Sequence, residues 1–256
     1  MSATSDDPLA LGQRVVSVLE TGARTATYKL ATLMALVDHC VEHLPARPGD
    51  PLAVPVRDLA LRVVELYWPQ VRTFESKPLR QSTQPVAKIL DAVMDLRSAT
   101  GAGDSGMSFA VASVRVPHEL DRTLDLVALT MVRQPLHRLQ KLPNGSGEPF
   151  LYDDSWMHDS VSRRTLAQHG NEILLFHGVA SGLARLSGLL RPALELLWVE
   201  DVRRMNRWLG EDVPDVAGHL FGRERISLAP AREALTEAFG PRCFYCERKV
   251  GASSPV

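Results

Sequence analysis

The stretch TATYKLATLMALVDHCVEHL, residues 25–44, places apolar side chains at the three- and four-residue intervals of a helix. These side chains form one broad stripe, which consists of Tyr28, Leu30, Leu33, Met34, Leu36, Val37, Cys40, Val41 and Leu44. A stripe of this width leaves little of the helix surface for polar side chains. The pattern therefore predicts a helix that is nearly buried among other helices.

Similar periodicity extends over much of the remaining chain and predicts a mainly α fold. The other helices are expected over residues 8–20, 56–68, 86–97, 119–133, 178–190 and 192–209. Gln134-Pro135 is expected to end the helix 119–133, and Pro192 to open the helix 192–209, because proline suits the first turn of a helix and disrupts its interior.

The turn-rich sequence PNGSG at 143–147 indicates the clearest boundary along the chain. Beyond it, the short apolar runs 150–152 and 173–176 have the length of strands, and their pairing predicts a small β element near 150–176. We expect three regions. These are an N-terminal helical region (1–145), a mixed segment with short strands and a long connecting helix (146–218), and a C-terminal stub (219–256).

Composition limits the classes of function. The 256 residues are 45% hydrophobic and 23% charged, and 29 basic side chains against 30 acidic ones give a net charge of −1. This balance excludes a basic coat over the whole surface but permits a local basic face. No apolar run reaches the roughly 18 residues of a membrane span, and the acidic N-terminus lacks the pattern of a signal peptide. We therefore expect a cytoplasmic protein that does not bind membranes.

Two groups of potential metal ligands favour structural interpretations. His39 and His43 share a helix face at a spacing that can bind a metal, but we favour a polar contact at the helix rim or in the core. Asp153 and Asp154 are candidates for magnesium, although aspartates in turns more often bond to their own backbone. The glycine-containing segment 99–106 follows a helix and lacks the Lys-Ser/Thr of a phosphate loop.

Basic side chains line the predicted helix 192–209 and crowd the C-terminal 38 residues. Arg203, Arg204 and Arg207 line the predicted helix 192–209, and Arg223 and Arg225 follow it. Further basic residues, Arg72, Lys77 and Arg80, flank Pro78 in the loop after the helix 56–68. Such a patch can neutralise phosphates, so we predict contacts of the first five arginines with duplex DNA. Ordinary solvated surface charge remains an alternative for many of these residues.

The motif Cys243-Phe-Tyr-Cys246 has the most specific chemistry. Two cysteines three residues apart on a tight turn can bind one zinc ion, but they supply only half of a tetrahedral site. Two ordinary thiols remain the alternative. A thioredoxin-like role would require a strand-to-helix junction in a βαβ unit, which the sequence does not show.

The C-terminal stretch 221–249 resembles the beginning of a zinc-stabilised HNH endonuclease domain of bacterial, actinobacterial type. The resemblance rests on a short helix at 230–239, the turn GPRCFYC at 240–246 and the basic residues that follow. The helix LLRPALELLWVEDVRRMN at 189–206 is similar to the connector before that nuclease, and TYKLA at 27–31 is similar to the family's N-terminal helical region. This family would imply a ββα-metal nuclease core that uses a divalent ion such as magnesium.

The sequence departs from the family pattern at its end. The family's zinc turn precedes a strand with Asp-His, whose histidine activates water, and a second CxxC follows. Here the chain reads SSPV at 253–256, about where Asp-His would begin. We therefore expect a chain truncated just before this motif, with no catalytic residue, a zinc half-site at Cys243 and Cys246, and no nuclease activity of its own.

Together, these observations predict the non-catalytic DNA-recognition or regulatory region of an HNH endonuclease from restriction or anti-phage defence. The alternative is a helical protein–protein interaction or regulatory module that binds no nucleic acid and contacts a partner protein or a second copy of itself.

Overall fold

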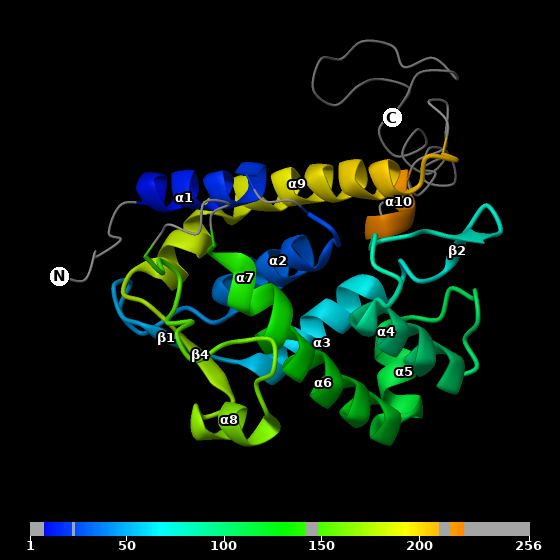
Figure 1. The fold of residues 1–256 in the computed structure, drawn as a ribbon, viewed down its shortest axis with the longest axis horizontal. Helices are drawn as coiled ribbons and strands as arrows, with labels where there is room; N and C mark the ends of the chain where they lie inside the picture. Colours follow the sequence, from blue (N-terminus) through cyan, green and yellow to red (C-terminus); the bar gives the residue numbers. More distant parts are fainter. Residues whose placement is uncertain (1–7, 22–23, 142–147, 210–215, 223–256) are drawn as a thin grey trace, which may run out of the picture. The chain divides into compact units, whose positions relative to one another are not determined.

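The computed structural model describes residues 8–21, 24–141, 148–209 and 216–222 (Figure 1). The chain divides into two compact units, Met1–Gly222 and Arg223–Val256, and the description below concerns the first. The expected division at 145/146 falls inside this unit. None of the described helices is long and apolar enough to cross a lipid bilayer.

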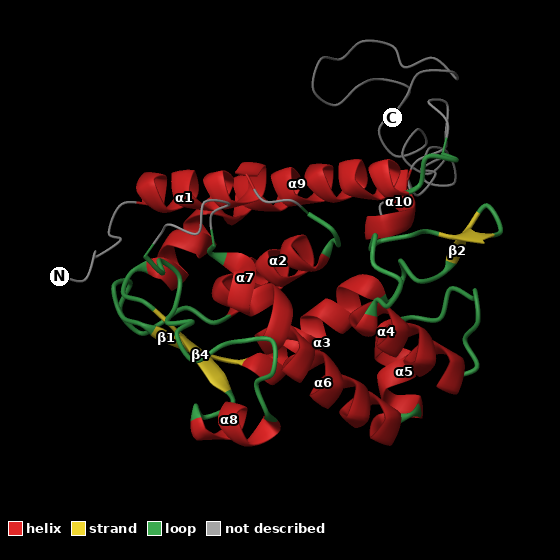
Figure 2. Ribbon diagram, viewed as in Figure 1, coloured by secondary structure: helices red, strands yellow, loops and turns green. Residues whose placement is uncertain are grey.

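The described unit is mainly helical, as predicted (Figure 2). Its helices are α1 (Pro8–Thr21), α2 (Tyr28–Glu42), α3 (Val56–Tyr67), α4 (Lys88–Ala99), α5 (Phe109–Arg115), α6 (Pro117–Met131), the π-helical turn η1 (Val132–Leu136), α7 (His137–Leu139), α8 (Arg163–Gln168), α9 (Val179–Met205) and α10 (Val216–Phe221). The ends of α1, α3 and α4 lie within about two residues of the ranges predicted from hydrophobic periodicity. Helix α2 lies inside the predicted stretch 25–44 and is shorter at both ends.

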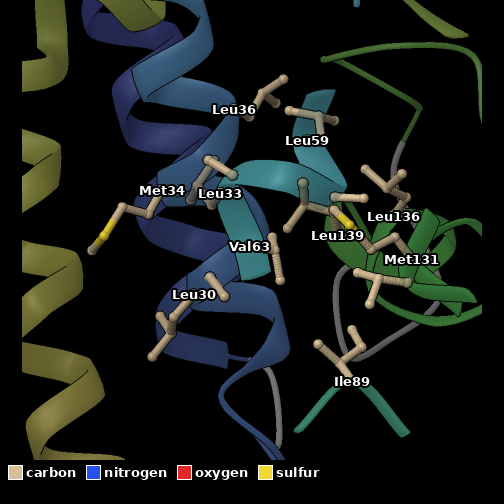
Figure 3. Close-up of a cluster of buried hydrophobic side chains, with 14 of the residues drawn as sticks. Leu30, Leu33, Met34, Leu36, Leu59, Val63, Ile89, Met131, Leu136 and Leu139 are labelled. Carbon is tan, nitrogen blue, oxygen red and sulfur yellow. The ribbon is translucent and has the colours of Figure 1, made fainter. Parts of the chain in front are cut away.

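Helix α2 occupies the core of the unit, as its broad apolar stripe predicted. Ten of its 15 residues are buried. Figure 3 shows Met34 directed toward α9, whereas Leu36 lies on the side of Leu59 from α3. The helix therefore packs between α9 and α3, and this central position explains why nearly every side of it is apolar.

The β structure is a small two-stranded antiparallel sheet, but one of its strands comes from an unexpected segment. Strand β4 (Glu172–Leu175) overlaps the predicted run 173–176 and pairs with β1 (Leu52–Pro55) in the register Leu52↔Leu175 to Pro55↔Glu172. The run 150–152 makes only an isolated bridge, between Tyr152 and Leu175. A second pair, β2 (Thr73–Phe74) with β3 (Lys77–Pro78), forms a short hairpin.

A buried glutamine explains why 150–152 is not a full strand. The Gln140 Oε1 accepts hydrogen bonds from the backbone N–H groups of Phe150 (3.0 Å) and Leu151 (2.8 Å), while its Nε2 donates to the Tyr152 carbonyl at 2.7 Å. These bonds satisfy buried backbone groups that would otherwise need a neighbouring strand.

Two prolines lie inside helical segments that we had expected them to interrupt. Pro135 falls in η1, where wider π-helical bonding continues the chain from α6 into α7. Pro192 lies within the continuous 27-residue helix α9, so the expected break there was wrong. Its ring is exposed, and the residue four positions earlier, whose carbonyl the ring approaches, is Gly188. Burial of Leu190 and Leu194 on either side holds the two halves together.

Candidate nucleic-acid interface

A buried polar network fixes the segment after the β2–β3 hairpin against α9. The Trp198 indole donates to the Gln81 Oε1 at 2.7 Å, and the Thr27 hydroxyl donates to the same oxygen at 3.0 Å. The Gln81 Nε2 in turn donates to the Gln70 Oε1 at 2.9 Å. Because all four side chains are buried, these bonds strongly favour one position of this segment.

Asn206 joins the same segment to the end of α9. Its Oδ1 accepts from the Arg80 backbone N–H at 2.8 Å, and its Nδ2 donates to the Arg80 carbonyl and the Val202 carbonyl, both at 2.7 Å. Asn206 is only 1% exposed and is the C-cap residue of α9. This pair of bonds places Arg80 beside the last turn of α9.

A buried carboxylate orders a second connection at the same end of α9. Asp201, which is 1% exposed, forms ion pairs with Arg24 (Nε–Oδ2, 2.6 Å) and Arg204 (Nη2–Oδ1, 2.9 Å). Arg204 also donates to the Arg24 carbonyl at 2.9 Å. Two guanidinium groups around one carboxylate leave a net positive charge at this point of the surface.

The arrangement gathers exposed cations from two segments that lie far apart in the sequence. We call this group the basic surface; it consists of Lys77, Arg80, Arg203, Arg204 and Arg207, all exposed. The Lys77 ammonium lies 5.0 Å from the centre of the Trp208 ring, which is 41% exposed. Among the described residues, Arg203 and Arg207 make no ion pair or side-chain hydrogen bond, so their guanidinium groups are free to bind an anion.

The structure places three of the five predicted DNA-binding arginines. Arg203 and Arg204 lie in the last turn of α9, but Arg207 follows the helix, which ends at Met205 and not at the expected residue 209. Asn206 has non-helical backbone angles (φ −121°, ψ 66°), so the helical spacing does not continue from Arg203 to Arg207. Arg223 and Arg225 lie outside the described residues, as do the predicted zinc ligands Cys243 and Cys246.

Sequence reasoning did not assign Lys77, Arg80 or Trp208 to this site. The sequence showed Lys77 and Arg80 as basic residues of a loop, but nothing local connects them to α9. The connection depends on the Asn206–Arg80 bonds between residues 126 positions apart. A buried asparagine at a helix end was the available signal, and its partner could not be identified from sequence spacing.

Three of the potential metal ligands, His39, His43 and Asp153, make local contacts within their own segments. The rings of His39 and His43 stack with centres 4.3 Å apart, and the His43 Nδ1 lies 3.2 Å from the His39 carbonyl. The Asp153 Oδ1 accepts from the Ser155 N–H at 2.9 Å, as in an Asx turn. Within the described ranges, no three histidine, cysteine or acidic side chains gather in a way that could hold a metal ion.

A charged cleft of about 460 Å³ beside α2, α3 and α9 is a less suitable anion site. Its two arginines are already neutralised, because Arg62 pairs with Glu42 and Arg191 pairs with Asp38 and Glu195. Its carboxylates outnumber its arginines, since Glu65 also lines it. The cleft would repel phosphate, whereas the basic surface has unpaired cations.

Searches of curated proteins and of solved structures gave no match to the chain. A family model does match residues 9–216, which include the whole basic surface and end before Cys243. Because this match covers most of its length, the chain belongs to the family described as Domain of unknown function (DUF8808).

Proposed function

We propose that this protein is a DNA-recognition or regulatory region of an HNH-type endonuclease, and that the basic surface contacts DNA phosphates. The observation that carries the proposal is the convergence of five exposed cations at the end of α9, in a chain whose net charge is −1. A local cluster of cations on a nearly neutral protein is the electrostatic pattern of a phosphate-binding face.

The individual side chains suit this role. Arginine presents a planar fork of donors that matches two phosphate oxygens. Arg203 and Arg207 would lose no existing ion pair on binding, whereas Arg204 would have to share its guanidinium with Asp201. Trp208 adds an exposed ring beside Lys77, a surface on which a base or sugar can pack.

The nuclease relationship adds further elements to the proposal. Arg223 and Arg225 would extend the phosphate contacts, and Cys243 and Cys246 would supply half of a structural zinc site. The complete nuclease would use a divalent ion such as magnesium for phosphodiester hydrolysis in restriction or anti-phage defence. We propose a cytoplasmic location, where such a protein would meet DNA.

The test compares two charge deletions in the full chain. One variant combines Arg203→Ala with Arg207→Ala. The control combines Arg163→Ala with Arg164→Ala, which removes the same charge from exposed arginines at α8, far from the end of α9 (Figure 1). Fluorescence anisotropy would measure binding to a short labelled duplex over a range of salt concentrations.

We expect the first variant to bind more weakly and to lower the log–log salt slope by about two units, because two phosphate contacts are lost. The control should retain nearly the wild-type slope. Equal losses in both variants would show that binding depends on overall charge and would contradict a defined interface. Metal-dependent nicking by the homogeneous protein would contradict the non-catalytic role.

An exposed apolar face on α9 favours a protein partner as the second candidate. Leu189 (74% exposed), Ala193 and Leu196 (70% exposed) lie at i, i+4 and i+7 on this helix. If this face mediates association, Leu189→Glu with Leu196→Glu should convert an oligomer or complex to monomer in sedimentation velocity without changing DNA binding. A wild-type protein that is monomeric and binds DNA would favour the first proposal.

A further inference from the structure

A small cavity lies directly beside the basic surface. It has a volume of about 210 Å³ and is lined by the segment around 78–87, by α4 and by residues 70–71, which follow α3. Its lining combines polar residues with apolar ones, and the apolar ones include Pro78, Leu79, Pro85, Leu90 and Met94. Arg80, whose backbone is held by Asn206, also lines the cavity, so the cavity and the basic surface share a residue.

The cavity contains a polar side chain whose hydrogen bonding is incomplete. Gln70 is 1% exposed, and its Oε1 accepts from the Gln81 Nε2 at 2.9 Å. Its own Nε2 is buried and has no hydrogen-bond partner. A buried donor without a partner costs roughly 1–3 kcal/mol, so an acceptor that paired with it would recover this free energy. The Gln70 amide therefore points to a ligand that offers an acceptor.

The dimensions and the lining select the class of ligand. A volume of 210 Å³ is below the roughly 300–1,000 Å³ of pockets that take drug-sized molecules, so the ligand should be one small ring system. Proline and leucine walls suit the faces of a flat ring, and the Gln70 amide suits an acceptor on its edge. The Asp91 carboxylate, which accepts from the Ala87 N–H at 3.1 Å, offers an acceptor for an amino group.

We propose that this cavity receives a single nucleobase that is turned out of DNA held on the basic surface. The inference rests on the proposed function and adds the part of the DNA that is recognised. Proteins that read an extruded base combine stacking between apolar or aromatic side chains with hydrogen bonds to the base edge. Here the two prolines, Leu90 and Met94 supply the walls, Gln70 supplies the donor, and Arg80 lies where the attached phosphate would pass.

The experiment uses a short duplex with 2-aminopurine at a central mismatch, because a mismatched base costs less to extrude. The fluorescence of 2-aminopurine rises when the base leaves the stack. We expect a severalfold rise when the full wild-type chain binds this duplex. Anisotropy on the same samples would report binding itself.

Two variants at the mouth of the cavity provide the matched comparison. Met94→Glu places a charge in the cavity wall at a side chain that is 47% exposed, so folding should be preserved. Val86→Glu makes the same charge change at a neighbouring exposed residue that does not line the cavity. Met94→Glu should abolish the fluorescence rise, whereas Val86→Glu should retain it. Gln70→Met, which removes the unpaired donor, should also reduce the rise.

The outcomes separate this inference from the proposed function. Duplex binding with no fluorescence rise, or with a rise that survives Met94→Glu, would overturn the base-binding cavity and leave the basic surface intact. If the duplex does not bind at all, the proposed function fails. In that case, saturation-transfer NMR with adenosine monophosphate tests separately whether the cavity binds a base. Binding that is lost in Met94→Glu would support a base-binding cavity, and absence of binding would overturn it.

Discussion

Replacement of Asn206 by alanine should disconnect Arg80 from α9 and destabilise the protein. The change removes three hydrogen bonds of 2.7–2.8 Å and leaves the Arg80 N–H and carbonyl without these partners. Each such bond contributes roughly 0.5–1.5 kcal/mol, so we expect a loss of about 2–4 kcal/mol. This is a large share of the roughly 5–15 kcal/mol by which a folded protein is stable.

Urea unfolding followed by circular dichroism would measure the effect. The urea concentration at the midpoint should fall, while the slope of the free energy of unfolding against urea concentration should stay unchanged. This combination indicates a loss of stability without a change in the unfolded state. Arg80→Ala is the control, because it keeps the backbone groups that Asn206 binds. This control should change stability by no more than about 0.5 kcal/mol but weaken DNA binding. Wild-type stability of Asn206→Ala would refute the role of these bonds in building the basic surface.

Three further predictions concern buried ionisable groups. The buried Arg97 guanidinium donates to the carbonyls of Trp68, Gly103 and Ser105 and so orders the loop after α4. Arg97→Met should therefore lower the free energy of unfolding, measured in urea, by roughly 2–4 kcal/mol. Burial lowers the pKa of His39, with a smaller contribution from the neighbouring His43. The unfolded chain therefore binds a proton at His39 more readily, so stability should fall as the pH drops below about 6.5, and His39→Phe should reduce this fall. Burial raises the pKa of the Cys40 thiol to about 12, so mass spectrometry should find Cys40 unlabelled by iodoacetamide at neutral pH unless the protein is unfolded.

Local patterns in the sequence predicted most of the helical framework. The apolar stripes of α1 to α4 repeat within each helix, so their positions required no knowledge of distant contacts. The partner of β4 was not predictable in this way. Strand β1 comes from residues before α3, and the expected partner at 150–152 is bound by Gln140 instead. Pairing between distant segments depends on tertiary packing, to which periodicity is insensitive.

The candidate site shows the same division between local and distant information. Arg203 and Arg204 could be found because arginines near a helix end are visible in the sequence. Arg80 and Lys77 joined them only through the bonds of Asn206 across the fold. The unpaired amide of Gln70 was likewise invisible, since a glutamine after a helix is usually an exposed residue.

The salt dependence of DNA binding by the wild-type chain tests the basic surface most directly. Each phosphate contact contributes about −0.9 to the slope of log affinity against log salt concentration. If the cations at the end of α9 and the predicted arginines that follow supply about five contacts, the slope for duplex DNA should be roughly −4 to −5. A slope near zero, or no binding at low salt to duplexes with or without modified bases, would contradict a phosphate-binding face and favour the protein-partner alternative.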